Sequence, residues 1–276
     1  MSRVCILTDS TVQFTQPTFR GHHLVYVIPC ELKPISQQDV SPLAMSAYPQ
    51  QLIPPTHQHY IHYFTQLAGQ YDSILVLTMS GLLSHAAKNA QKAAEMFGNH
   101  AWIQVFDSLT TAVGLGLLVQ KAAEIAEGGA CLKEIEECIR AVAPHVYMLL
   151  CIPELVFLAQ AGYLTHAQAL VGEILGLLPI FILEEGRLVP LDKVRTHRHL
   201  FESFQEFVNE FEQLSHIALL RGVNNNTLRT RPFREFIQDS FPQATFCEQT
   251  TNPYLAALFG PQSICLVIQE ELRGVE

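Results

Sequence analysis

Residues 74–97 read ILVLTMSGLLSHAAKNAQKAAEMF, an apolar run that breaks at Ser80-Gly81 and resumes with a different periodicity. Residues 74–77 have the β-branched and aliphatic character of a buried strand. After the break, apolar residues recur at helical spacing: Leu83, Ala86, Ala87, Ala90, Ala94 and Phe97. The stretch therefore predicts a strand, a tight loop and a helix, with a serine in the loop.

The loop at Ser80 is a candidate ligand site. In open α/β sheets, ligands bind at loops that leave the carboxyl ends of strands. The free N–H groups and the positive dipole end of the following helix favour a carboxylate or a phosphate there. A structural alternative is that Ser80 and Ser84 only end the strand and cap the helix.

Composition excludes several classes of protein. The 276 residues are 49% hydrophobic with a mean hydropathy of +0.18, which leaves room for an apolar cavity as well as a core. No apolar stretch reaches the roughly 18 residues of a membrane span, and the N-terminus lacks a secretory cleavage site, so a cytoplasmic protein is expected. The net charge of −9 argues against a nucleic-acid partner. Seven cysteines without a Cys-x-x-Cys pair indicate buried thiols rather than disulfides or a zinc site.

A second polar cluster, Thr8-Asp9-Ser10-Thr11, follows a short apolar strand at residues 4–7. Asp9 has the position of a phosphoryl-accepting nucleophile, but the second aspartate expected two residues later is Thr11. We therefore expect these side chains to bind neighbouring backbone donors.

Three histidines begin the next predicted helix, His57, His59 and His62. His57 and His59 would share a face only on a strand, whereas His59 and His62 would share one only on a helix. Because no carboxylate lies close by, neither a metal nor a cofactor is expected.

The chain as a whole predicts an α/β fold with two domains. Strands alternate with helices up to residue 152, which indicates a mainly parallel sheet covered by helices. From residue 153 the pattern includes a hairpin signal at Glu184-Glu185-Gly186-Arg187, so the second domain is expected to have a mixed sheet. The predicted domains are residues 1–152 and 153–276, and residues 33–55 are expected to be irregular.

Several separated stretches resemble the DegV family. They are ILTDSTVQF (6–14), LTMSGLLSHAAKNA (77–90), VFDSLTTAVGLGLLVQKAAE (105–124), LAQAGYLTHAQALVGEILGLLPIFILEEGRLVPLDKVR (158–195) and FGPQ (259–262). Members of this family bind a long-chain fatty acid between two α/β domains, and some serve as the acyl-binding subunit of a bacterial fatty-acid kinase. The resemblance implies a non-enzymatic carrier of an acid such as palmitate or stearate, with a kinase subunit and transient membrane contact as further partners.

The resemblance also implies a carboxylate site. Ser80 would hold the carboxylate together with backbone donors at Gly81 and Leu82 and the hydroxyl of Thr56. Arg195 would lie near the head-group end of an apolar tunnel between the domains.

The chain departs from the family pattern near the head group. The family histidine two residues before its Gly-Pro turn is Leu258 here, ahead of Gly260, and the family Gly-Gly-Arg becomes Ala161-Gly162-Tyr163. These losses bear on the kinase-partner role more than on binding, because hydroxyl and backbone donors remain. We hypothesise that His57 or His85 supplies the absent imidazole.

Two other functions compete with the carrier. Ser80 could be the nucleophile of an acyl-transfer enzyme, although Met79-Ser80-Gly81 lacks the preceding glycine of a nucleophile elbow and no base is identifiable nearby. A ligand-free regulatory interaction module is the other alternative.

Overall fold

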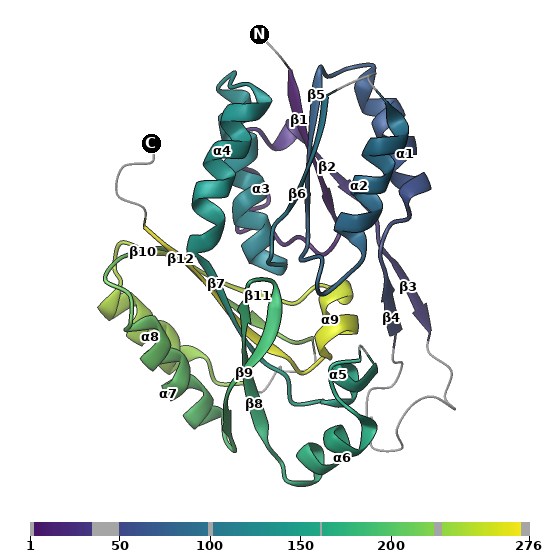
Figure 1. Cartoon of the computed structure of the whole chain (residues 1–276). Coiled ribbons are helices and arrows are strands. Elements are labelled where there is room, and N and C mark those ends of the chain that lie inside the picture. The colour runs from purple at the N-terminus through teal and green to yellow at the C-terminus, as the bar shows by residue number, and fades with distance from the viewer. Residues whose placement is uncertain (1–2, 35–49, 99–101, 161, 224–227, 272–276) are drawn as a thin grey trace.

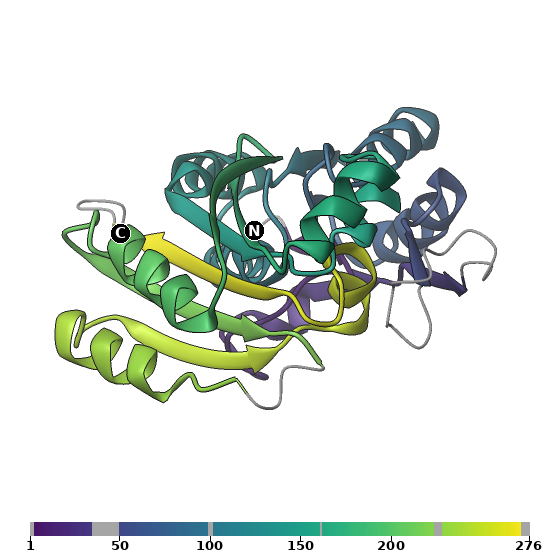
Figure 2. The same cartoon turned by 90° about the horizontal axis from the view of Figure 1, so that it is seen from below.

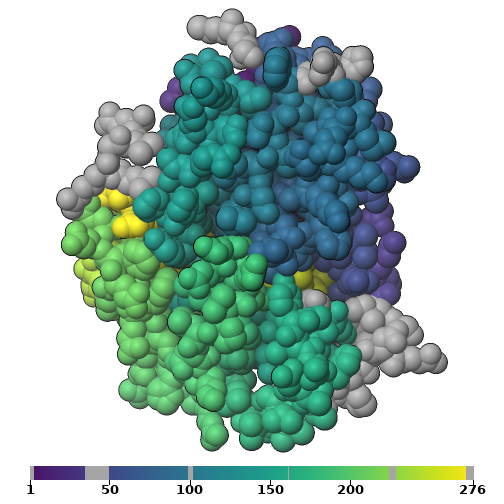
Figure 3. Space-filling model, viewed as in Figure 1, coloured from purple at the N-terminus to yellow at the C-terminus, as the bar shows by residue number. Residues whose placement is uncertain are grey.

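The computed structural model of the chain describes residues 3–34, 50–98, 102–160, 162–223 and 228–271. Figure 1 shows two halves, one above the other, each built on its own sheet. Figure 3 shows the same face in space-filling form, with the blue and teal N-terminal half above the green C-terminal half. No helix in the described residues is long and apolar enough to cross a membrane.

The sheet of the N-terminal half is wholly parallel, with the strand order β2-β1-β5-β6. Its strands are β1 (Val4–Asp9), β2 (Val25–Ile28), β5 (Ser73–Thr78) and β6 (Trp102–Asp107). The central strands β1 and β5 are buried along their whole length, as both faces of the sheet are covered. The predicted strand, loop and helix at residues 74–97 are confirmed, since α2 (Ala86–Phe97) follows β5.

Helices cover both faces of this sheet because successive strand residues point in opposite directions. One face packs against α1 (His57–Ala68) and α2, and the other packs against α3 (Ala112–Glu127) and α4 (Leu132–Val142). In β5 the alternation is direct: Ile74 and Val76 join the cluster with α1, whereas Leu75 and Leu77 join the cluster with α3.

The sheet of the C-terminal half is mixed, with the order β11-β10-β12-β7-β8-β9. Only β10 and β11 are parallel neighbours, and the other pairs are antiparallel. The strands are β7 (Val146–Cys151), β8 (Leu178–Glu184), β9 (Arg187–Val194), β10 (Leu214–Arg221), β11 (Thr245–Thr250) and β12 (Ile264–Glu270). The predicted hairpin is confirmed as β8–β9, and α7 (His197–Val208) and α8 (Arg231–Ser240) pack on the outer face of the sheet.

Strand β7 lies in a different sheet from the one that the sequence pattern indicates. The alternation of strands and helices assigns it to the N-terminal parallel sheet, but β7 pairs antiparallel with β12 and β8. The inner face of the mixed sheet shares one hydrophobic cluster with α3 and α4, including Met148, Leu150 and Leu118. The division at residue 152 stays a prediction, and the strand pairing favours a boundary before Val146.

Smaller elements complete the two halves. They are the short helices α5 (Val156–Gln160), α6 (His166–Ile174) and α9 (Pro253–Phe259), the ribbon of β3 (Glu31–Pro34) and β4 (Gln50–Ile53), and the 3-10 turns His22–Leu24 and Ala143–His145. The expectation of irregular chain at residues 33–55 is wrong at its ends, because β3 and β4 pair antiparallel. Residues 35–49 lie outside the described residues. Helix α9 has no counterpart in the sequence prediction.

Candidate functional site

The loop after β5 is tied to the end of the neighbouring strand β6. The Ser80 N–H donates to the carbonyl oxygen of Thr110 at 2.8 Å. The Gly81 N–H donates to both carboxylate oxygens of Asp107, at 3.1 and 3.0 Å. Asp107 is the last residue of β6, so two strand ends fix the position of the loop.

The Ser80 hydroxyl connects the two halves of the molecule. It is fully buried, and its Oγ donates to the carbonyl oxygen of Gly186 at 2.8 Å. The same Oγ accepts the Leu82 N–H at 3.2 Å. Gly186 lies in the β8–β9 turn with φ +80°, and a Cβ there would lie 2.5 Å from Ser80 Oγ. The turn of the C-terminal half therefore covers Ser80 and satisfies its hydroxyl.

A cavity of about 780 Å³ opens beside this loop. It lies between the N-terminal half and the α5, α6 and α9 helices of the C-terminal half, which are on the right in Figure 1. Its apolar walls include Leu82, Leu83, Phe157 and Leu258. Polar side chains also reach it, among them His85, Gln160, Tyr163 and His166. Cavities of this size and mixed lining are typical of small-molecule sites.

The structure brings some of the predicted site residues together at this cavity. Gly81, Leu82, His85 and Leu258 line it, and Ser80 lies directly behind the lining, next to Gly81. His85 immediately precedes α2, and at this position it lines the cavity. Leu258, which stands in place of the family histidine, is almost fully buried in the cavity wall.

Four other predicted residues do not line the cavity. Thr56 caps α1, where its Oγ1 accepts the His59 N–H at 3.4 Å, and His57 is the first residue of that helix. Arg195 is exposed between β9 and α7. Gly260 ends α9 with φ +90°, and a Cβ there would lie 2.9 Å from a Glu154 carboxylate oxygen.

The structure adds residues that the sequence analysis did not place at the site. The strand β4 lines the cavity with Gln50, Gln51, Leu52 and Ile53, although its segment has no strand signal. Tyr163 donates its hydroxyl to the Leu82 carbonyl oxygen at 3.1 Å, which joins α5 and α6 to the Ser80 loop. In the sequence, the only sign of a role for Tyr163 is that it stands where the DegV family pattern has an arginine.

A half-buried carboxyl, Glu154, anchors the turn after α9. Its Oε2 accepts the Gln262 N–H at 3.2 Å. Burial raises the pKa of this carboxyl, and the bonds from Gln262 oppose that shift. Glu154 therefore holds the Gly260 turn against α5, whose Phe157 lines the cavity.

The cluster after β1 is closed, as the sequence indicates. Asp9 is fully buried and accepts hydrogen bonds from Thr11 N, Thr11 Oγ1 and Met79 N at 3.0, 2.6 and 2.8 Å. Burial raises the pKa of Asp9, and these three bonds oppose the shift. A carboxylate enclosed in this way cannot be approached by a phosphoryl donor.

Two of the three histidines of α1 have structural partners. His59 Nδ1 accepts the Thr56 N–H at 3.4 Å in a capping box, and His62 contacts Gln66 at 3.0 Å. The described residues contain no group of three or more His, Cys, Asp or Glu side chains that could hold a metal ion.

Together, the fold and the cavity define a class of α/β protein with a parallel and a mixed sheet in separate halves and a ligand-sized cavity at the junction of these halves. Residues 3–271 match the model of the "Uncharacterised protein, DegV family". The chain therefore belongs to the DegV family.

Curated relatives match part of the chain. A DegV domain-containing protein of Deinococcus radiodurans is 29% identical over 157 residues, which is 57% of this chain and 55% of that protein. One from Staphylococcus aureus is 29% identical over 174 residues, 60% of each. The chain thus spans somewhat more than half the length of these relatives.

Solved structures show the same fold over almost the whole chain. The Streptococcus pneumoniae fatty acid kinase (Fak) B3 protein loaded with linoleic acid has a TM-score of 0.80 at 21% identity, covering 98% of this chain and all of that one. A DegV family protein of Eubacterium eligens loaded with heptadecanoic acid has a TM-score of 0.78 at 17% identity, covering 97% and 100%. These similarities confirm the predicted combination of a parallel and a mixed sheet.

Proposed function

We propose that this protein binds a long-chain fatty acid, such as palmitate or stearate, in the cavity beside the Ser80 loop. The observation that carries this function is the cavity of about 780 Å³ at the junction of the two halves, in a chain of the DegV family. Solved relatives with the same fold are loaded with heptadecanoic and linoleic acids.

The acyl chain would pack against the apolar walls of the cavity. Leu82 and Leu83 come from the N-terminal half, and Phe157 and Leu258 come from the C-terminal half. Each methylene removed from water contributes about 0.8 kcal/mol, so a chain of palmitate length needs few polar contacts for tight binding. The polar side chains of the cavity then orient the head group.

The carboxylate would be held at the Ser80 loop by an exchange of hydrogen-bond acceptors. In the structure Ser80 Oγ donates to the Gly186 carbonyl, and the Gly81 N–H donates to Asp107. A ligand carboxylate could replace the Gly186 carbonyl, because charged acceptors form the stronger hydrogen bonds. Gly81 and Leu82 complete the proposed clamp. The hydroxyl of Thr56 stays a predicted member of it, because Thr56 caps α1 and does not line the cavity.

An imidazole contribution is better supported for His85 than for His57. His85 lines the cavity, whereas His57 does not. His166, the first residue of α6, lines the cavity from the C-terminal half. We therefore assign to His85 the role of the histidine that Leu258 replaces.

The surroundings of Ser80 support a role in binding better than a role in catalysis. Its hydroxyl is bonded to a backbone carbonyl and a backbone N–H, and no basic side chain contacts it in the described ranges. Nucleophilic catalysis by serine requires such a base within hydrogen-bond reach.

The wider role is a cytoplasmic carrier that presents the acid to a kinase subunit. The exposed side chain of Arg195 is available to such a partner. Transient membrane contact would use the C-terminal end of α6, where Val171, Ile174 and the following Leu175 are exposed, on the helix that begins with the cavity-lining His166. An Ile174→Asn variant should then bind anionic vesicles more weakly than the unmodified protein and exchange acid with them more slowly.

Titration of the delipidated protein with palmitate tests the function. We expect one acid per chain, with an affinity about tenfold lower in Ser80→Ala, since hydrogen bonds to charged groups are worth about 1.5 to 3 kcal/mol. Failure to bind palmitate, stearate and unsaturated acids of similar length would refute the proposed function.

A further inference from the structure

A second cavity lies on the far side of the C-terminal sheet from the proposed acyl site. Its volume is about 580 Å³, and it lies between the N-terminal turns of α7 and α8. Figures 1 and 2 both show these two helices on one side of the six-stranded sheet, with α5, α6 and α9 on the other side. The sheet therefore separates this cavity from the one beside Ser80.

The walls of this cavity are apolar and partly aromatic. Phe201 of α7 and Phe233 of α8 line it, with ring centroids 5.4 Å apart and ring planes inclined by 30°. Both rings are largely buried, so they form the floor of the cavity, and Leu228 and Pro232 extend the apolar surface outward. A flat apolar body could pack against these four side chains.

The rim of the cavity is cationic, in a chain whose net charge is −9. Arg198 and Arg229 line it, and among the described lining residues the only carboxylate is Glu202. Glu202 is paired with Arg198 at 2.9 Å. Arg229 is exposed and has no hydrogen-bond or ion-pair partner in the described part of the chain. One guanidinium is thus available to an incoming anion.

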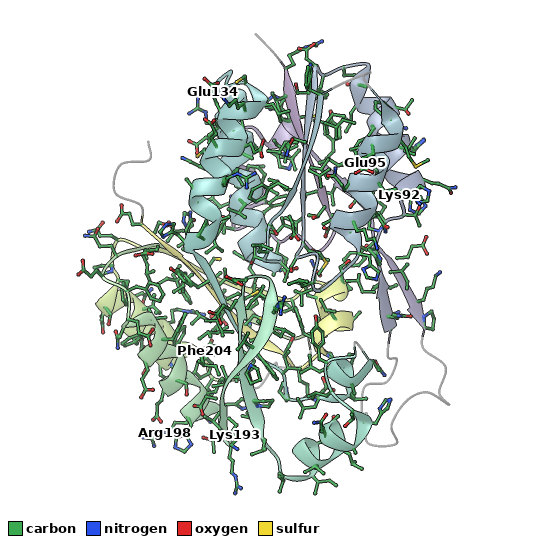
Figure 4. The ribbon with its side chains drawn as sticks, in the orientation of Figure 1. Lys92, Glu95, Glu134, Lys193, Arg198 and Phe204 are labelled. Atoms are coloured by element: carbon green, nitrogen blue, oxygen red, sulfur yellow. The ribbon has the colours of Figure 1, made fainter. Side chains whose placement is uncertain are left out.

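A further cation, Lys193, lies at the same end of the C-terminal half, although it does not line the cavity. Lys193, at the end of β9, has no carboxylate within ion-pair distance among the described residues. Figure 4 shows Lys193 and Arg198 at the same lower end of the C-terminal half, below Phe204. A single carboxylate or phosphate group is the complement of this rim, because guanidinium groups bind such groups in a bidentate manner.

We propose that the cavity between α7 and α8 binds a small aromatic carboxylate, with its ring against Phe201 and Phe233 and its carboxylate on Arg229. The site is independent of the fatty-acid site, since the two cavities share no lining residue. It gives the protein a second ligand class, of a size that the 580 Å³ cavity accommodates.

The test compares 2-naphthoate with its neutral isostere 2-naphthamide by calorimetric titration of the full chain saturated with palmitate. We expect the acid to bind about tenfold more tightly than the amide, because a hydrogen bond to a charged group is worth about 1.5 to 3 kcal/mol. Arg229→Gln should remove this preference. Glu202→Gln should strengthen the binding of 2-naphthoate by about two- to fivefold by removing a nearby negative charge.

Arg231→Gln is the matched control. Arg231 is an exposed arginine two residues further along the chain, the first residue of α8, which is paired with Glu235 and does not line the cavity. It should leave the affinity for 2-naphthoate unchanged. Equal affinities for acid and amide, an unchanged affinity in Arg229→Gln, or displacement of 2-naphthoate by palmitate would overturn the proposed site.

Discussion

Two loops leave the carboxyl ends of the neighbouring strands β1 and β5, and both carry polar residues at equivalent places. After β1, Asp9 and Thr11 bond to each other and to the backbone, and both are fully buried. After β5, Gly81 and Leu82 line a cavity, and the Ser80 hydroxyl is bonded to the C-terminal half. The first loop therefore stabilises the sheet edge, whereas the second carries the proposed carboxylate site.

The difference arises from what covers each loop. Asp9 is enclosed by its own half, with Met79 and Thr11 as donors. Ser80 is covered by the β8–β9 turn, which belongs to the other half and is 106 residues away in the chain. The polar cluster that is a candidate binding site is therefore the one covered by an element of the other half.

The largest expected effect is on stability, at the closed loop. Asp9→Ala would leave the Thr11 and Met79 donors buried without an acceptor. Each unsatisfied buried donor costs about 1 to 3 kcal/mol, so we expect the free energy of unfolding to fall by about 3 kcal/mol or more. Urea denaturation followed by circular dichroism measures this loss. A loss under about 1 kcal/mol would contradict the structural role of Asp9.

The next effect concerns the turn that covers Ser80. Gly186→Ala would place a Cβ 2.5 Å from Ser80 Oγ at a residue with φ +80°. Gly162→Ala is the matched control, because Gly162 has φ +83° with nothing within 4 Å of the added carbon. Backbone strain of about 1 kcal/mol is common to both variants, and Gly186→Ala should lose about 1 to 2 kcal/mol more. Thermal unfolding measures the difference, and equal losses would show that the turn does not press on Ser80.

A smaller effect separates the serines of the open loop. Both Ser80 and Ser84 accept a backbone N–H two residues ahead, from Leu82 and Ala86, but only Ser80 is part of the proposed clamp. We expect Ser80→Ala to weaken palmitate binding about tenfold and Ser84→Ala to change it less than twofold. Fluorescence displacement of a bound acid measures both. Equal effects of the two substitutions on the affinity for palmitate would show that Ser80 does not bind the carboxylate.

The smallest effect distinguishes the two histidines. His85→Ala should weaken palmitate binding by about two- to fivefold, since His85 is an exposed residue of the cavity lining. His57→Ala should leave the affinity unchanged, because His57 lies outside the cavity lining. If Leu258→His raised the affinity while a His57→Ala/His85→Ala double variant kept it, neither histidine would be the substitute imidazole.

Local patterns of the sequence predict much of the fold. The aliphatic run and helical spacing around Ser80 define β5 and α2. Thr165 caps α6 by accepting the Gln168 N–H at 3.2 Å, and threonine is a common residue at this position. The turn at Glu185-Gly186 closes the β8–β9 hairpin. These features depend on residues that are close together in the chain, so a single sequence is enough to predict them.

Long-range pairing accounts for what the sequence did not predict. Strand β7 has the same aliphatic character as β5, and only its partners β12 and β8 assign it to the mixed sheet. The bond between Ser80 and Gly186 joins distant parts of the chain that no local pattern relates. Helix α9 did have a local signal, because Asn252 caps it and Pro253 occupies its first position.

Mass spectrometry of the lipid extracted from purified, denatured protein tests the central claim most directly. Binding in a cavity of about 780 Å³ at the junction of the halves predicts about one long-chain fatty acid per chain, with less retained in Ser80→Ala than in Ser84→Ala. An extract without fatty acid, from protein that also takes up no palmitate after delipidation, would contradict the account.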